Sequence, residues 1–253
     1  MSTISRRKNI LAMLEEEEMI KTTELSEQLN VSVMTIRRDL NSLSKDGLVT
    51  LIHGGAALNR GALFEHNLLY KKETLNDEKR RIGEFCTRFV NEGDAIFIDT
   101  GSTALKIAEA LVEKKNLLVM SHSLVAQQML AHSKGIKLIS TPGVFREKTY
   151  GFLGQLTCEF IKGFRIDTLF LGVEGVDIEH GFTVPDITDG ETKRALVNQA
   201  SQIVVVADYT KIGISYFMTI APLNRVDILV TNENADPDII KEIRAQGVTV
   251  YLV

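Results

Sequence analysis

The chain has 253 residues, of which 44% are hydrophobic and 25% charged, and its formal net charge is −4. This length suits a small domain followed by a medium one, and the acidic balance does not by itself indicate nucleic-acid binding, because the position of the charges matters more than their sum. No apolar run is long enough to cross a bilayer and no secretory signal is recognisable, so we expect a cytoplasmic protein without a membrane partner.

The first sixty residues are typical of a helix-turn-helix. Residues 4–17 are predicted to form a supporting helix, and a shorter helix capped by Thr22 or Thr23 leads to a tight turn at Asn30. The next helix begins after Ser32, an expected N-cap, and its apolar residues recur at spacings of three and four. A short helix, a tight turn and a capped helix with a basic face are the elements of a DNA-binding motif.

A wing is predicted to follow this motif. Gly47 is expected to end the second helix, and the strand 48–52 then leads into the glycine turn 53–55. The residues that we expect at the DNA are Ser32, Met34, Thr35, Arg37, Arg38 and His53. The arginines would contact phosphates and bases, and Met34 and Thr35 would approach base edges. An ordinary amphipathic helix with a solvated charged face is the alternative, and the agreement of cap, turn, helix and wing argues against it.

Further basic residues precede the motif. Arg6, Arg7 and Lys8 are expected to gather with the basic residues of the second helix on one face. Such a patch would provide the local positive charge that a phosphate backbone requires, despite the acidic total.

The pattern changes to an alternation of strands and helices from Asp77 onward. Short apolar runs of this kind are typical of buried parallel strands. The predicted strands are Ala95–Asp99, Leu117–Met120, Ile136–Ser140, Thr168–Val173, Ile203–Ala207, Ile228–Val230 and Val248–Leu252. We therefore predict an α/β fold with a mostly parallel sheet. The predicted boundaries are a winged helix-turn-helix domain at residues 1–57, a linker at 58–76 and a larger α/β domain at 77–253.

Polar loops follow several of these strands, and ligands of open α/β sheets bind at the carboxyl ends of strands. The candidate residues there are Asp99, Thr100, Gly101, Ser102, Thr103, Ser121, His122, Ser123, Gly143, Asp208 and Lys211. Any single loop is equally well an ordinary turn, and His122 alone is more often structural. Four such loops at one edge favour a small polyol phosphate, with the turn at 101–103 and Lys211 suited to its phosphate.

The run Val31–Leu40 with the HGGA sequence at His53–Ala56 closely resembles the DeoR-type bacterial transcriptional regulators. The resemblance extends along the chain through Asp99–Thr103, Gly154, Gly172, Gly181 and Asp208–Lys211. It implies a winged helix-turn-helix joined to a sugar-phosphate-sensing domain. Thr50 departs from the family, which often has an arginine near that position.

The family's sensor domain is similar to ribose-5-phosphate isomerase and to the CoA-transferase fold. The segment 101–104 matches the isomerase phosphate loop, and an ungapped alignment back from Asp208 puts the isomerase's catalytic glutamate at Lys193 and its catalytic lysine at Val184. Proton transfer on a sugar requires a positioned base, so the resemblance implies binding without catalysis. We expect no catalytic residue, and Lys193 joins the candidate effector-binding residues. The alternative is an isomerase or a CoA transferase with an added N-terminal domain, and Glu174 is the candidate transferase nucleophile.

The resemblance therefore implies a sequence-specific DNA-binding regulator, a repressor of a carbohydrate-utilisation operon that is modulated by a phosphorylated sugar. Its partners would be a double-stranded DNA operator and the sugar phosphate. A homodimer or homotetramer is expected, because palindromic half-sites mirror a two-fold protein. A winged domain that contacts protein instead of DNA is a third hypothesis, and the basic second helix argues against it. The two cysteines, Cys86 and Cys158, lack the close spacing of zinc or redox motifs, so we predict no metal site and no cofactor.

Overall fold

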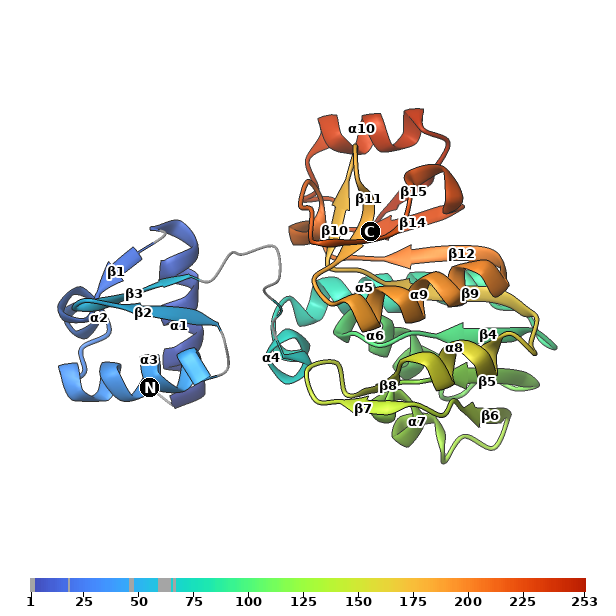
Figure 1. The fold of residues 1–253 in the computed structure, drawn as a ribbon, viewed down its shortest axis with the longest axis horizontal. Helices are drawn as coiled ribbons and strands as arrows, with labels where there is room; N and C mark the ends of the chain where they lie inside the picture. Colours follow the sequence, from blue (N-terminus) through green and yellow to red (C-terminus); the bar gives the residue numbers. More distant parts are fainter. Residues whose placement is uncertain (1–2, 18, 46–47, 59–64, 66) are drawn as a thin grey trace. The chain divides into compact units, whose positions relative to one another are not determined.

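The computed structural model describes residues 3–17, 19–45, 48–58, 65 and 67–253. The chain forms two compact units, Met1–His66 and Asn67–Val253 (Figure 1). Gly47, the predicted end of the second motif helix, lies outside the described residues. In the described part of the chain, none of the helices is long and apolar enough to cross a membrane.

The first unit is a winged helix-turn-helix. Its elements are α1 (Thr3–Glu16), β1 (Met19–Lys21), α2 (Thr22–Gln28), α3 (Val33–Lys45), β2 (Val49–Ile52) and β3 (Gly55–Leu58). The strands form an antiparallel sheet in the order β1-β3-β2, so the predicted wing is confirmed. Leu14, Leu25, Ile36 and Leu40 are among its buried residues, which explains the spacing of the apolar residues along α3.

The entry to α2 differs from the prediction. Helix α2 begins at Thr22, and the residue before it is Lys21 in an extended conformation. The predicted threonine cap is therefore wrong. The physical reason is the unpredicted strand β1, because Lys21 still pairs with Gly55 of β3 and the Thr22 N–H donates to the Gly54 carbonyl at 2.8 Å. The chain turns directly from a strand into a helix.

The second unit is an α/β domain. Its helices are α4 (Leu68–Glu73), α5 (Asn76–Cys86), η1 (Thr87–Phe89), α6 (Ser102–Leu111), α7 (Leu124–Leu130), α8 (Gln155–Ile161), α9 (Ile187–Gln199), η2 (Tyr209–Lys211), η3 (Leu223–Arg225) and α10 (Pro237–Ala245). Its strands are β4 (Ala95–Ile98), β5 (Leu117–Ser121), β6 (Ile136–Ser140), β7 (Val144–Arg146), β8 (Gly151–Leu153), β9 (Ile166–Gly172), β10 (Gly175–Asp177), β11 (Gly181–Val184), β12 (Ala200–Val206), β13 (Met218–Ala221), β14 (Ile228–Thr231) and β15 (Thr249–Leu252).

The central sheet of this unit is parallel throughout. Its strand order is β15-β14-β12-β9-β4-β5-β6, and every neighbouring pair is parallel. All the strands predicted after Asp77 lie in this sheet, which confirms the predicted fold class. The carboxyl ends of β4, β9 and β12 lie next to one another, because these strands are neighbours in the sheet.

Helices cover both faces of the sheet (Figure 1). Residues of α5, α6 and α7 pack in one apolar core with Ile96 and Ile98 of β4, whereas residues of α8, α9 and α10 pack in another with Phe97. Successive side chains of a strand point to opposite faces, so both faces of β4 are buried. This arrangement explains why the strands appear in the sequence as continuous apolar runs.

Short antiparallel strands supplement the parallel sheet. Strands β7 and β8 form a hairpin, and β10, β11 and β13 form a small sheet of their own. These strands are not predictable from the sequence, since strands of three or four residues carry too little periodicity to be recognised. They lie in the segments that follow β6, β9 and β12, and β10 begins directly after Glu174.

Candidate functional site

The outer face of α3 is open to solvent. The Met34 side chain is 65% exposed, and Arg37 and Arg38 are exposed on the same helix. Ser32 is exposed before the helix, and Thr35 is half-buried in its first turn. The helix thus presents polar, basic and flexible apolar side chains together, which suits contact with both phosphates and base edges.

The start of α3 is fixed by side-chain hydrogen bonds. The Thr35 N–H donates to Ser32 Oγ at 3.2 Å, which confirms Ser32 as the N-cap. Ser26 Oγ donates to the Val31 carbonyl at 2.6 Å, and Asn30 has the predicted left-handed conformation with a φ of 50°. These contacts hold the turn between α2 and α3, so the orientation of α3 is defined within its unit.

A buried carboxylate on α3 holds α1. Asp39 accepts hydrogen bonds from Arg6 Nε at 2.5 Å and from Arg7 Nε at 3.0 Å. Arg6 is buried, so it does not belong to an open basic face. The expectation for Arg6 is therefore corrected, because its charge compensates Asp39 within the unit. The exposed arginines of α3, Arg37 and Arg38, have no such partner in the structure's described contacts.

The tip of the wing carries His53. This histidine is exposed between β2 and β3, and Gly54 beside it has a φ of 80°, a conformation that favours glycine. A Cβ atom at Gly55 would lie 2.3 Å from the Ile20 carbonyl oxygen, so the close pairing of β1 with β3 also requires glycine. The two glycines let the wing turn sharply and present His53.

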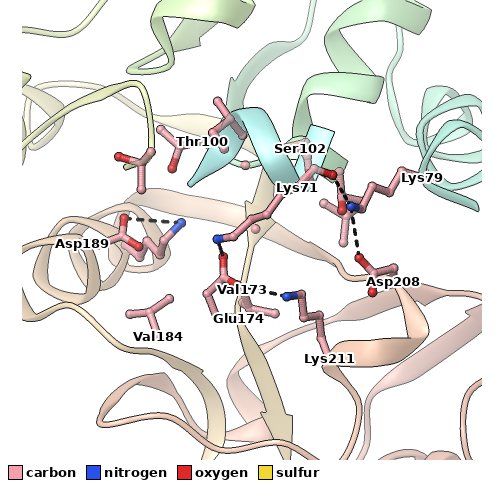
Figure 2. Close-up of a pocket in the computed structure, with 18 of the residues that line it drawn as sticks. Lys71, Lys79, Thr100, Ser102, Val173, Glu174, Val184, Asp189, Asp208 and Lys211 are labelled. Atoms are coloured by element: carbon pink, nitrogen blue, oxygen red, sulfur yellow. Dashed lines mark hydrogen bonds and ion pairs between the residues drawn. The ribbon is translucent and has the colours of Figure 1, made fainter. Parts of the chain in front are cut away.

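The second unit contains a pocket at the carboxyl ends of β4, β9 and β12 (Figure 2). Its walls come from α4, from the start of α6, from the segment after β9 and from the loop after β12. Its polar and charged lining residues are Lys71, Lys79, Thr100, Ser102, Thr103, Lys148, Thr149, Glu174, Asp189, Lys193, Asp208 and Lys211. The cavity volume is about 40 Å³.

Asp99 is a buried connection point beneath this pocket. One carboxylate oxygen accepts the Thr100 N–H at 2.7 Å and lies 2.6 Å from His122 Nε2. The other accepts the Gly172 N–H at 2.9 Å and forms an ion pair with Lys193. Asp99 therefore joins β4, β5, β9 and α9 at the floor of the site.

The pKa of Asp99 reflects these partners. Burial alone would raise it, but the Lys193 ammonium and the hydrogen bond with His122 lower it to about 2. For Lys193 the directions are reversed. Burial alone would lower its pKa, but Asp189 and Asp99 hold it above its usual range. Both groups are therefore charged at neutral pH, as a buried ion pair.

Glu174 lies between two ammonium groups (Figure 2). Lys71 of α4 and Lys211 of η2 both donate to its carboxylate, Lys211 at 3.1 Å. Burial would raise the pKa of Glu174, but Lys211 and Lys71 together hold it well below its usual range. Burial would lower the pKa of Lys211, and Glu174 and Asp208 raise it. The three side chains form a charged cluster in the pocket wall.

Lys79 is a further cation at this wall. Its Nζ lies 3.6 Å from Asp208 and donates to the carbonyls of Lys71 at 2.7 Å and Thr74 at 2.8 Å. Burial lowers its pKa to about 8, although Asp208 acts in the opposite direction. Lys79 is thus a buried ammonium that a further anion in the pocket would stabilise.

The structure brings most of the predicted ligand residues together. The pocket is lined by Thr100, Gly101, Ser102, Thr103, Lys193, Asp208 and Lys211. Asp99 and His122 lie in the layer below, where both are buried. Among the described contacts, Ser121 Oγ donates to the Ile98 carbonyl and Ser123 Oγ accepts the Ala126 N–H at the start of α7.

Gly143 serves the packing of the β7–β8 hairpin. A Cβ atom there would lie 2.5 Å from Thr157 Oγ1 and 2.7 Å from the backbone of Phe152. Gly143, Ser121 and Ser123 are not among the residues that line the pocket.

Sequence reasoning missed Lys71 and Lys79 as pocket residues and considered Glu174 only as a nucleophile. Lys71 lies in the segment that was predicted to be a linker, and Lys79 lies on a helix whose apolar face alone was recognised. Leu68, which is buried, is the signal that this segment packs on the domain. Nothing in the spacing of the two lysines indicates that their ammonium groups converge.

Comparison with protein-family models gives two matches. Residues 6–61 match the DeoR-like helix-turn-helix domain, and residues 75–233 match the DeoR C terminal sensor domain. One match lies in each structural unit.

Curated relatives match over almost their whole length. The glycerol-3-phosphate regulon repressor of Escherichia coli is 30% identical over 234 residues, which are 92% of each chain. The HTH-type transcriptional regulator IolR of Bacillus subtilis is 28% identical over 236 residues, again 92% of each chain. A putative aga operon transcriptional repressor of Escherichia coli O157:H7 is 26% identical and covers 99% of this chain and 94% of its own.

Solved structures give weaker similarities. The full-length sorbitol operon regulator SorC of Klebsiella pneumoniae aligns with 96% of this chain and 99% of its own, at 12% identity and a TM-score of 0.43. Ribose 5 phosphate isomerase A of Neisseria gonorrhoeae aligns with 56% of this chain and 55% of its own, at 20% identity and a TM-score of 0.42.

Proposed function

Since the chain belongs to the DeoR family of DNA-binding transcriptional regulators, we propose that it represses a carbohydrate-utilisation operon and responds to a phosphorylated sugar. The observation that carries this proposal is the convergence of Lys71, Lys79 and Lys211 with the start of α6 in one pocket. The relatives named as repressors of a glycerol-3-phosphate regulon and of an aga operon support the sign of regulation and the class of operon.

The family membership also makes the chain a regulator rather than an enzyme, so the isomerase and CoA-transferase alternatives are set aside. The pocket is consistent with this conclusion. Lys193, which stands where the resemblance put an isomerase glutamate, pairs with Asp99 and Asp189. Val184 is a buried apolar residue of the wall, and Glu174 is held by two lysines instead of being available as a nucleophile.

The start of α6 is suited to the phosphate group. The first N–H groups of a helix have no partner within it, and the helix dipole favours an anion there. Gly101 precedes the helix with a φ of 112°, so its backbone turns without a side chain in the way. The hydroxyls of Ser102 and Thr103 lie beside these N–H groups on the same wall. Lys71, Lys79 and Lys211 would supply the positive charge. Asp189 and Asp208 would accept hydrogen bonds from sugar hydroxyls.

The DNA-binding step belongs to the first unit. Operator DNA is the partner that its family implies, and we assign contact with it to Ser32, Met34, Thr35, Arg37, Arg38 and His53. One small winged unit neutralises few phosphates, so we infer that a homodimer or homotetramer binds a palindromic operator. A regulator of this kind acts where the chromosome is, in the cytoplasm.

A thermal-shift screen tests the effector. The purified chain is mixed with a panel of phosphorylated sugars, glycerol 3-phosphate and the unphosphorylated parents. A ligand present at a hundred times its dissociation constant stabilises the folded state by about 2.7 kcal/mol. We expect a shift from one phosphorylated compound and none from its parent.

Two lysine variants make the screen specific. Lys211→Met should abolish the shift, whereas Lys162→Met should retain it, because Lys162 is an exposed residue that follows α8 and pairs with Glu159. A shift that survives Lys211→Met, or that the parent sugar produces equally, would refute the assigned pocket. A panel without any shift would refute the sugar-phosphate effector while leaving DNA binding to be measured separately.

A further inference from the structure

Glu174 occupies the position where an anion from outside would be expected. Its carboxylate is bound by the ammonium groups of Lys71 and Lys211, and its side chain is 16% exposed toward the pocket. Figure 2 shows the two lysines reaching Glu174 from different elements, with Asp208 and Lys79 paired beside them. The protein's own carboxylates therefore already pair with the ammonium groups that would attract a phosphate and offset part of their charge.

An incoming phosphate has to compete with this arrangement. Carboxylate and phosphate oxygens accept the same ammonium hydrogens, so an anion that binds Lys71 and Lys211 takes the place of Glu174. The cavity volume of about 40 Å³ points in the same direction, because ligand pockets usually measure about 300–1,000 Å³. Entry of such a ligand requires a side chain in the wall to move.

The same contacts fasten α4 to the sensor unit. Lys71 is a residue of α4, and Lys79 donates to the carbonyls of Lys71 and Thr74 at the end of that helix. The Leu68 N–H at the start of α4 donates to the Lys148 carbonyl at 2.9 Å. Helix α4 is the first helix after the chain leaves the DNA-binding unit. Two of its attachments therefore depend on lysines that line the effector pocket.

We propose that Glu174 is a built-in competitor for the anionic group of the effector, and that its displacement from Lys71 and Lys211 loosens α4. The inference rests on the proposed sugar-phosphate function and adds the regulation of that site. It restricts the effector to ligands with a strongly anionic group, since a neutral sugar does not replace a carboxylate between two ammonium groups. It also connects the pocket directly to α4, which lies near the start of the second unit.

The first test measures the binding of inorganic phosphate to the full chain by isothermal titration calorimetry. The variant Glu174→Gln keeps the shape of the side chain and removes the competing charge. We expect it to bind phosphate at least ten times more tightly than the wild type does. The matched control is Glu179→Gln, at the exposed turn between β10 and β11, at the opposite end of that strand pair from Glu174. It should bind phosphate as the wild type does.

The outcomes separate the inference from the proposed function. Phosphate binding that is equal or weaker in Glu174→Gln would overturn the competitor, while loss of binding in Lys211→Met would still uphold the pocket. An absence of phosphate binding in the wild type and in Glu174→Gln alike would overturn both. An equal gain in Glu179→Gln would also overturn the competitor, because a general change of charge would then explain it.

A second measurement uses the wild type alone and therefore does not depend on whether Glu174→Gln folds. Hydrogen exchange of the peptide that covers residues 68–74 is followed with and without saturating phosphate. We expect faster exchange with phosphate, because α4 is then held through an exchangeable anion instead of through Glu174, which is fixed in the chain. Unchanged or slower exchange in that peptide, with phosphate bound, would overturn the loosening of α4.

Discussion

The substitution Asp99→Asn tests whether the floor of the pocket depends on a buried ion pair. Asp99 is 1% exposed, and each of its carboxylate oxygens has two partners. An asparagine has one acceptor oxygen and one NH2 group. Whichever way the amide is oriented, its NH2 group faces a backbone N–H, of Thr100 or of Gly172. The Lys193 ammonium also loses its closer anion while it remains buried, and Asp189, at 3.7 Å, is the anion that is left.

The expected loss of stability is large. Removal of one partner of a buried pair typically costs about 3–5 kcal/mol, because the other charge stays uncompensated. A domain of ordinary stability has about 5–15 kcal/mol in total, so Asp99→Asn should unfold the second unit at a clearly lower urea concentration. The unfolding of the first unit should not change, since Asp99 belongs to the other unit.

Urea denaturation followed by far-ultraviolet circular dichroism measures the loss, because the chain has no tryptophan to serve as a fluorescent probe. The double variant Asp99→Asn with Lys193→Met removes the orphaned charge. It should lose at least about 2 kcal/mol less than the sum of the two single variants. Glu92→Gln, an exposed control, should leave the midpoint unchanged. A loss of less than about 1 kcal/mol in Asp99→Asn, or strict additivity in the double variant, would refute this account of the floor.

Two further predictions concern the DNA-binding face and the buried lysine. The double variant Arg37→Ala with Arg38→Ala should weaken binding to an operator selected from genomic fragments by at least a hundredfold, since base contacts contribute about 1–3 kcal/mol each and phosphate contacts add to them. Fluorescence anisotropy measures the affinity for the operator, and the thermal shift with the sugar phosphate should be retained in the variant. Wild-type affinity in the variant would show that α3 is not the helix that contacts the bases. Lys79 should make stability rise with pH between about 8 and 10, because its pKa is about 8 in the folded state and 10.5 for an unperturbed lysine, so the unfolded chain binds more protons in that window. The difference in unfolding free energy between the wild type and Lys79→Met should grow by at most about 1.4 kcal/mol per pH unit, and a flat difference in urea titrations would contradict the pKa.

The parallel sheet and α3 could be predicted because their sequence patterns reflect burial directly. A strand such as β4 is covered on both faces, so every side chain in it is apolar. Helix α3 has one buried face and one exposed face, and this difference appears as a spacing of three and four. The hairpin β7–β8 has no such signature, because its three-residue strands are partly exposed and depend on contacts with the rest of the unit.

The position of the pocket could be predicted, and its chemistry only in part. Parallel strands bring their carboxyl ends to one edge whatever the side chains are, so the loop 100–103 and Lys211 were expected there. The pairing of Asp99 with Lys193 joins residues 94 positions apart. Such a contact depends on how α9 lies against the sheet, and no local pattern encodes it. The pairing of Arg6 with Asp39 was missed for the same reason.

The balance of charge in the pocket argues that its selectivity comes from exchange of partners more than from attraction at a distance. Glu174 is matched by Lys71 and Lys211, and Asp208 is matched by Lys79. A pocket whose ammonium groups are already paired in this way attracts anions less strongly, so a ligand gains affinity mainly where its own acceptors replace those of the protein in the right geometry. Inorganic phosphate should consequently bind the wild type weakly, and a sugar phosphate whose hydroxyls also reach Asp189 or Asp208 should bind more tightly. A wild-type chain that binds phosphate and the complete sugar phosphate with equal affinity would contradict this argument.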